Sequence, residues 1–206
     1  MNVAEARRDR EPGSASPAEL DELTLRRAQR GEPAACRALV ERYQRPVFAL
    51  LHRMMGQARR DRVEDLAQET FLSVFRALGQ FAPLGPARLS SWILTIASRR
   101  AIDELRRSGE SAAPAALAVE SELVSPARAD DRARRRDLAL RVECAVGDLA
   151  PEFRAAFLLR EMHGLEYAEI ARALSIDLGT VKSRLARARA ALRAALADLE
   201  EDGDVA

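Results

Sequence analysis

The sequence is poor in cysteine, histidine and aromatic residues, and each shortage excludes a class of protein. Its 206 residues include only 2 cysteines and 2 histidines, too few for a disulfide scaffold or a zinc module. Cys36 and Cys144 are far apart and lack a Cys-x-x-Cys spacing, so we interpret them as small buried side chains rather than redox groups. Aromatic residues make up 4% of the chain and β-branched runs are scarce, which disfavours strands.

Long apolar runs and catalytic motifs are also missing. A membrane-spanning helix needs about 18 apolar residues in succession, and no apolar run in the sequence approaches that length. The N-terminus also lacks the apolar core of a signal peptide. We therefore expect a cytoplasmic protein without a membrane partner. There is no His-Glu-x-x-His site, phosphate-binding glycine loop or nucleophile elbow. Acid pairs such as Glu64 and Asp65 have no partnering base. We expect no catalytic residues, no metal and no cofactor, and so no enzyme.

The residues that are abundant are alanine, leucine and arginine, which favour helices. Residues 19–108 carry 16 basic and 11 acidic side chains, and residues 132–197 carry 13 and 8. Acidic stretches, 109–131 and 198–206, follow these two basic segments. The pattern predicts an all-α protein with two small helical domains that face polyanions, joined by a flexible linker.

Residues 167–196 predict a helix-turn-helix: a helix over 167–174, a break over 175–179 and a longer helix from about Thr180. Ile170, Ala171 and Leu174 recur at helical intervals in the first helix. One face of the second helix carries the apolar residues Val181, Leu185, Ala188 and Leu192. Its opposite face and rims carry Thr180, Lys182, Ser183, Arg184, Ala186, Arg187, Arg189 and Ala190. Small residues between long cations suit a helix that reads the major groove, although a solvated basic face is the alternative.

The run from 169 to 193, with its Gly-Thr-Val-Lys-Ser-Arg-Leu core at 179–185, resembles region 4 of sigma factors of the extracytoplasmic-function (ECF) branch of the sigma-70 family. The resemblance implies that this helix reads the minus-35 promoter element. The residues it implicates are Thr180, Lys182, Ser183, Arg184, Ala186 and Arg187. Ser175 stands where the family commonly has Gly; serine can serve this turn if its backbone angles are ordinary, so we expect the exchange to have little effect.

A second helix is predicted over 61–78, with Leu72 exposed among carboxylates. By itself this pattern fits a solvated helix with one stray leucine. The sequence at 64–78 resembles sigma region 2.2, which implies that it grips the clamp helices of the RNA polymerase β′ subunit. The residues assigned to that contact are Asp65, Gln68, Glu69, Leu72 and Arg76.

Residues 79–89 contain two Gly and two Pro and predict a loop. Ser90 is predicted to cap the next helix, 91–107, which resembles sigma regions 2.3 and 2.4 and implies contact with the minus-10 element. The residues assigned to that contact are Trp92, Thr95, Arg99, Asp103 and Arg106. Arg99 replaces the family's usual Asn, a change that favours phosphate, and Trp92 fits the core better than a stacking platform. Without the resemblance, this cationic helix end is as consistent with a solvated face as with single-stranded DNA.

The remaining segments complete the predicted organisation. We expect a disordered tail over 1–17, a region 2 domain over 18–108, an acidic linker over 109–131, a region 4 domain over 132–197 and an acidic tail over 198–206. Helices are predicted over 19–30, 34–56, 132–146 and 152–162, with Pro46 bending the second or marking a boundary in it. The last of these is predicted to bury Phe153, Phe157, Leu158 and Met162. The linker is either a simple tether or, by family analogy, a segment that passes toward the active cleft of the polymerase.

The resemblance implies an ECF-type sigma factor that binds core RNA polymerase through the β′ clamp helices and the β subunit. It also implies binding to double- and single-stranded promoter DNA and control by an anti-sigma factor. An autonomous helix-turn-helix regulator is the alternative, and it would need a receiver or ligand domain with alternating strands and helices. A helical adaptor that binds no DNA is a third hypothesis.

Overall fold

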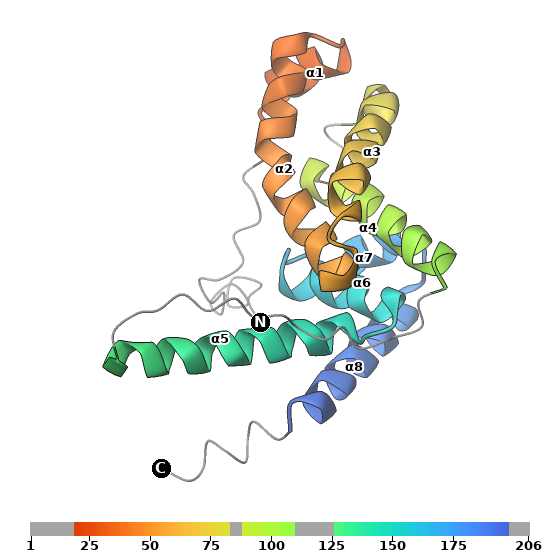
Figure 1. Ribbon diagram of the computed structural model, residues 1–206. Coiled ribbons are helices and arrows are strands. Elements are labelled where there is room, and N and C mark those ends of the chain that lie inside the picture. The colour runs from red at the N-terminus through yellow and green to blue at the C-terminus, as the bar shows by residue number, and fades with distance from the viewer. Residues whose placement is uncertain (1–18, 83–87, 110–125, 198–206) are drawn as a thin grey trace, which may run out of the picture.

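The computed structural model describes residues 19–82, 88–109 and 126–197, and all regular structure in them is helical (Figure 1). The all-α prediction is confirmed. The elements in order are α1 (Glu22–Gln29), α2 (Pro33–Met55), η1 (Gln57–Arg59), α3 (Arg62–Ala77), η2 (Leu78–Gln80), α4 (Leu89–Arg107), α5 (Pro126–Gly147), α6 (Pro151–Glu161), α7 (Tyr167–Leu174) and α8 (Leu178–Ala195). The predicted tails, most of the linker and residues 83–87 of the predicted loop lie outside the described residues.

Helices α1 to α4 pack around one apolar core, and the periodicity that predicts them also predicts which faces they bury. The stripe on α3 includes Val63, Leu66 and Val74, and that on α4 includes Ile93 and Leu105; all are buried. The leucine at position 72 points away from this core and is 54% exposed. The predicted amphipathic pattern of both helices is therefore confirmed.

Helix α2 runs through Pro46 for 23 residues in total, so Pro46 marks no helix boundary, and the predicted alternative of a bend there stays a prediction. Proline removes one backbone hydrogen bond from a helix interior. Tyr43 and Val47, on either side of it, remain buried in one helical register, as do Leu50 and Leu51 further along. Packing against α3 and α4 thus compensates for the lost hydrogen bond.

The predicted cap of α4 by Ser90 is also wrong. The helix begins two residues earlier than predicted, at Leu89, and its first amides point at the carboxylate of Glu19. That carboxylate accepts hydrogen bonds from the amides of Leu89 and Ser90 at 3.1 and 3.4 Å and from the Ser90 hydroxyl at 2.5 Å. A carboxylate suits this place because the first turn of a helix carries unpaired N–H groups and a positive partial charge.

Helices α5 to α8 form the second group. Helix α5 begins at Pro126, six residues before the predicted start at Arg132 and inside the predicted linker. In α6 the predicted core is partly wrong: Leu158 is buried, but Phe153, Phe157 and Met162 are only half-buried. The buried residues of α6 are Arg154, Ala155, Ala156, Leu158 and Leu159. Small alanines let neighbouring helices approach closely, and this pushes the large side chains to the rim.

The turn between α7 and α8 differs from expectation at both ends. Ser175 has φ 52° and ψ 48°, in the left-handed region rather than at ordinary angles. This conformation ends α7 as a C-terminal cap, a place that glycine fills without strain. Helix α8 starts at Leu178, two residues earlier than predicted, because the Asp177 carboxylate accepts from the amide of Thr180 at 2.7 Å.

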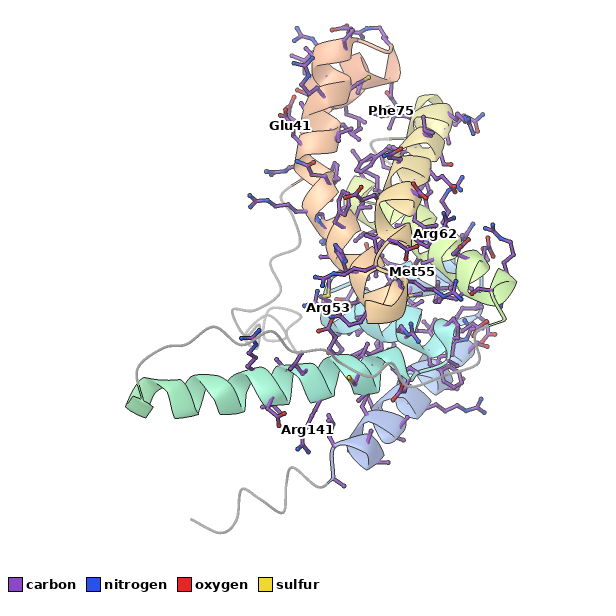
Figure 2. The ribbon with its side chains drawn as sticks, viewed as in Figure 1. Glu41, Arg53, Met55, Arg62, Phe75 and Arg141 are labelled. Carbon is purple, nitrogen blue, oxygen red and sulfur yellow. The ribbon has the colours of Figure 1, made fainter. Side chains whose placement is uncertain are left out.

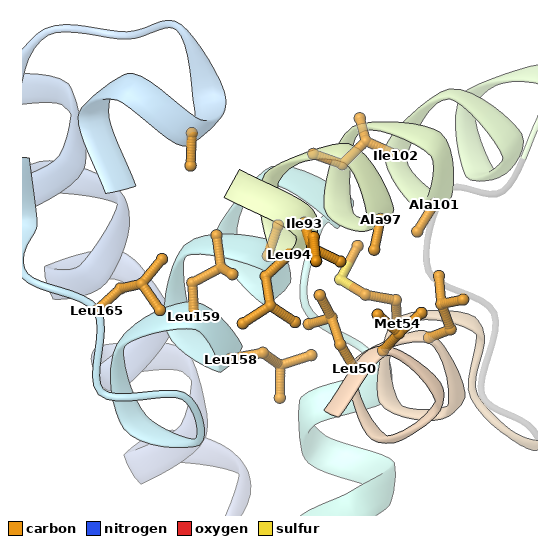
Figure 3. Close-up of a cluster of buried hydrophobic side chains, with 14 of the residues drawn as sticks. Leu50, Met54, Ile93, Leu94, Ala97, Ala101, Ile102, Leu158, Leu159 and Leu165 are labelled. Carbon is orange, nitrogen blue, oxygen red and sulfur yellow. The ribbon is translucent and has the colours of Figure 1, made fainter. Parts of the chain in front are cut away.

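The two groups of helices contact each other directly. Helix α4 lies against α6 and α7, and the carboxyl end of α2, with Arg53 and Met55, meets α5 and α6 (Figures 1 and 2). Figure 3 shows Leu94 of α4 among Leu158 and Leu159 of α6 and Leu50 of α2. The buried apolar residues of both groups form one continuous cluster. This contact determines which candidate functional surfaces are free.

Candidate polymerase and nucleic-acid interfaces

The helix-turn-helix places the predicted groove-reading residues on an open face of α8. The opposite face, with Val181, Leu185, Ala188 and Leu192, is buried against the rest of its group. Lys182, Ser183, Ala186 and Arg187 are exposed, whereas Thr180 and Arg184 are half-buried. Helix α7 is fixed at its start by Glu169, which accepts from the amide of Glu166 at 2.9 Å.

Several α8 side chains already have local partners. The Thr180 hydroxyl donates to the Asp177 carboxylate at 2.5 Å, and the Ser183 hydroxyl donates to the Thr180 carbonyl at 3.0 Å. Hydrogen bonds from the hydroxyl and from the amide of Thr180 hold the pKa of Asp177 below its usual range. The guanidinium of Arg187 lies 5.9 Å from the centre of the Phe153 ring. Thr180 is therefore engaged by the capping residue Asp177 in this structure, while Lys182, Ser183 and Arg187 are exposed.

Helix α3 carries all five residues predicted to contact the polymerase. Asp65, Gln68, Leu72 and Arg76 are exposed and Glu69 is half-buried. Asp65 accepts from Arg62 at 2.7 Å, and Glu69 accepts from Arg100 of α4 at 2.6 Å. Both carboxylates lie on the N-terminal side of the exposed Leu72, and an arginine holds each of them in place.

An apolar groove runs beside Leu72 between α2 and α3, with a volume of about 370 Å³. Its lining residues are Val40, Gln44, Phe48, Ala67, Gln68, Phe71, Leu72 and Phe75. Phe75 is labelled on α3 in Figure 2. The α2 wall of this groove was not predicted from the sequence. The spacing of Val40, Gln44 and Phe48 at every fourth residue was the available signal, because it places all three on one side of the helix.

The residues predicted to contact the minus-10 element are spread along α4, and the structure does not leave them all free. Trp92 is half-buried beside Phe81, with ring centres 5.2 Å apart, so it packs against the core as expected. Thr95 is half-buried, and its hydroxyl donates to the Ser91 carbonyl at 2.7 Å. Asp103 is exposed. Arg99 and Arg106 are hydrogen-bonded to the second group of helices.

The pairing of Arg106 has an electrostatic signature. Its Nε and Nη2 donate to one oxygen of Glu152 at 2.9 and 2.6 Å. Burial raises the pKa of Glu152, but hydrogen bonds from Arg106 and from its own amide, with the charges of Arg106 and Arg184, outweigh this and lower the pKa overall. Glu152 therefore interacts with cations of both predicted DNA-reading helices.

Two buried polar residues escaped the sequence analysis. Arg154 donates to the carbonyls of Met54, Gly147 and Leu149, the last at 3.0 Å. His163 is buried, and burial, with a smaller contribution from the charge of Arg53, lowers its pKa to about 4. Neither residue lies in a sequence pattern that marks it as buried, because arginine is mostly exposed in proteins and histidine is buried only in some.

The described residues contain no group of three or more potential metal ligands and no helix long and apolar enough to cross a membrane.

Comparisons with known proteins agree with these features. The family model Sigma-70 region 2 matches residues 39–110, and Sigma-70, region 4 matches residues 139–192. The RNA polymerase sigma-H factor of Pseudomonas aeruginosa is 32% identical over 189 residues, which span 88% of this chain and 96% of that protein. The ECF RNA polymerase sigma-E factor of Escherichia coli K12 is 31% identical over 180 residues, or 84% and 92% of the two chains.

Among solved structures, CnrH in complex with the cytosolic domain of CnrY superposes with a TM-score of 0.60 at 26% identity, covering 88% of this chain and 97% of that one. The sigma factor RpoE of Bartonella quintana, solved with the anti-sigma factor NepR, gives 0.56 at 22% identity over 78% and 95% of the chains. The second likeness shows the fold alone.

Proposed function

Because the chain belongs to the ECF branch of the sigma-70 family of RNA polymerase sigma factors, we propose that it directs promoter-specific transcription initiation. In this role it binds core RNA polymerase, recognises the minus-35 and minus-10 elements and helps to melt the DNA of the minus-10 region. Its relatives are initiation factors rather than enzymes, and we place its activity in the cytoplasm, with the polymerase.

The observation that carries the proposal is the two-sided character of α8. One face is buried by four apolar side chains, and the other offers Lys182, Ser183 and Arg187 around the small Ala186. A helix with small residues at its centre can approach the base edges of the major groove, while arginine can donate two hydrogen bonds to guanine and lysine can reach phosphates. Asp177 fixes the start of the helix, and therefore where these side chains point.

The groove between α2 and α3 supports the polymerase contact. Its walls are mainly apolar, and Leu72 and Gln68 are exposed at its edge, with Asp65 and Arg76 on the same helix. An apolar groove rimmed by charges suits a partner helix that inserts apolar side chains and pairs its own charges at the rim. We assign it to the clamp helices of the β′ subunit, and we assign the flanking charges to orientation of that helix.

The charged end of α4 suits single-stranded DNA. Arg99 and Arg106 lie about two turns apart on one helix, a separation over which cations can neutralise successive phosphates. Trp92 supports the helix by packing against Phe81 and the core.

The alternative function, an autonomous regulator, would need a receiver-type domain of alternating strands and helices. No described residue of the first group of helices lies in a strand, so nothing supports such a domain. Since structures of the neighbours contain CnrY and NepR, we also expect an inhibitory anti-sigma partner.

The test is initiation in a purified system. The chain and core polymerase together should start transcripts on a cognate promoter that neither starts alone. Replacing Arg187 by Ala should weaken promoter binding by about 1–3 kcal/mol, with the loss confined to one position of the minus-35 element. Arg141→Ala, on the exposed side of α5, removes the same charge elsewhere and should change neither binding nor transcription. Full activity of the Arg187 variant would remove α8 from the reading role.

A further inference from the structure

We propose that Glu19 and Gln29 are positioning residues for recognition of the minus-10 element. Both come from the segment that precedes α2, and neither is among the residues assigned to DNA or to the polymerase. Together they hold the two described ends of the connection between α3 and α4, and with them the first turn of α4. This role rests on the proposed function, which assigns α4 to the minus-10 element. It adds two residues that set the base preference of α4 without contacting DNA.

Gln29 holds the end of the connection that follows α3. It is the last residue of α1, and Figure 1 shows α1 and the carboxyl end of α3 at the same end of the first group of helices. Its side-chain Nε2 donates to the carbonyls of Leu78 and Phe81 at 3.0 and 2.8 Å. The amide of Phe81 donates to the same Leu78 carbonyl at 3.1 Å. Because a primary amide carries two N–H groups, one side chain from α1 fixes both ends of this turn.

Glu19 holds the other end of the connection. Its carboxylate accepts hydrogen bonds from the amides of Leu89 and Ser90 and from the Ser90 hydroxyl. The carboxylate is itself fixed to α2, because the hydroxyl of the buried Tyr43 donates to it at 3.3 Å and accepts from the amide of Leu20 at 3.0 Å. Burial, with a smaller contribution from the charge of Glu19, raises the pKa of Tyr43 to about 12. The hydroxyl therefore keeps the proton that it donates at neutral pH.

The two positioning residues act on the same part of α4. Phe81, which Gln29 holds, packs against Trp92 with ring centres 5.2 Å apart. Trp92 is the fourth residue of the helix whose first amides Glu19 holds, and Thr95 follows one turn later. Reading of base edges requires side chains held to within about 0.5 Å, whereas phosphate contacts carry no sequence information. Loss of either positioning residue should therefore lower base preference more than general affinity for DNA.

The test uses variants of the full chain, each with a matched control. Gln29→Met keeps the length of the side chain but donates no hydrogen bond, whereas Gln29→Lys keeps a donor. Gln57→Met makes the same exchange at an exposed glutamine of η1, at the opposite end of α2. Glu19→Ala removes the acceptor at the start of α4. Its control, Glu22→Ala, removes a carboxylate of equal charge that pairs with Arg26 within α1.

The measured quantity is the base preference of initiation. Each chain is combined with core polymerase and two libraries of barcoded templates built on the cognate promoter, one randomised in the minus-10 element and one in the minus-35 element. Products are counted by template, and the preference at a position is the ratio between its best and its worst base. A chain that only folds less well gives proportionally less product from every template, so the ratio stays unchanged. Affinity for core polymerase is measured in parallel by surface plasmon resonance.

We expect Gln29→Met and Glu19→Ala each to lower the preference in the minus-10 element about three- to tenfold, because base contacts lose their fixed geometry. Their preference in the minus-35 element and their affinity for core polymerase should match those of the wild-type chain. Gln29→Lys should retain the wild-type minus-10 preference, and so should the controls Gln57→Met and Glu22→Ala.

Three results would overturn the proposal. These are an unchanged minus-10 preference in either Gln29→Met or Glu19→Ala, an equal fall of the minus-35 preference in these variants, and a fall in Gln29→Lys as large as in Gln29→Met. Failure of the proposed function is read separately, as an absence of initiation by the wild-type chain with core polymerase.

Discussion

Replacing Arg154 by Met is the sharpest test of how the fold is held together. This guanidinium is only 7% exposed, and it donates to three main-chain carbonyls at the ends of α2 and α5 and in the turn that follows α5. Methionine fills a similar length of apolar space but donates no hydrogen bond. The three carbonyls would lose a charged donor in a region that water does not reach.

The size of the effect follows from these contacts. A hydrogen bond to a charged group contributes about 1.5–3 kcal/mol, and breaking a buried charged interaction costs about 3–5 kcal/mol in total. The apolar contacts of the methionine offset part of this, so we expect the free energy of unfolding to fall by about 3 kcal/mol. For a chain of this size that corresponds to a fall in Tm of about 6–12 °C.

The assay is urea unfolding followed both by circular dichroism and by the fluorescence of Trp92, the single tryptophan of the sequence. Trp92 lies on α4 in the first group of helices, so agreement of the two curves shows whether the groups unfold together. Arg141→Met is the control, because Arg141 is exposed on α5 and pairs only with Asp137 among the contacts described. A loss below about 1 kcal/mol would refute the assignment of Arg154 as a capping residue for both groups.

Three further predictions concern single residues. Because the pKa of His163 falls from 6.5 to about 4 on folding, the unfolded chain binds its proton first, and stability should drop by up to about 3 kcal/mol as the pH falls through this window; urea curves of His163→Gln should show a smaller drop. Ser175→Gly should be about 1 kcal/mol more stable to urea than Ser175→Ala, because both lose the hydroxyl but only glycine relieves the left-handed backbone. Leu72→Ala should weaken binding to core polymerase about tenfold by surface plasmon resonance, whereas Leu23→Ala, at a 58% exposed leucine, should not.

The sequence predicted best what depends on local periodicity. The buried faces of α3, α4 and α8 follow from apolar residues three and four apart, and they were assigned residue by residue. The helix-turn-helix was found for the same reason. The exposure of Leu72 was predicted because it is apolar on an otherwise polar face, but its assignment to the polymerase contact came from the family resemblance.

The sequence failed where a residue's role depends on a partner distant in the chain. Serine is a common helix-capping residue, which is why Ser90 was predicted as the cap. Instead, the carboxylate of Glu19, 71 residues earlier in the chain, accepts the hydrogen bonds at the start of α4. Arg154 is buried because the carbonyl of Met54, 100 residues away, needs a donor. Ser175 adopts left-handed angles because α7 must end there, and no property of serine predicts this. These are tertiary effects, and no local window contains them.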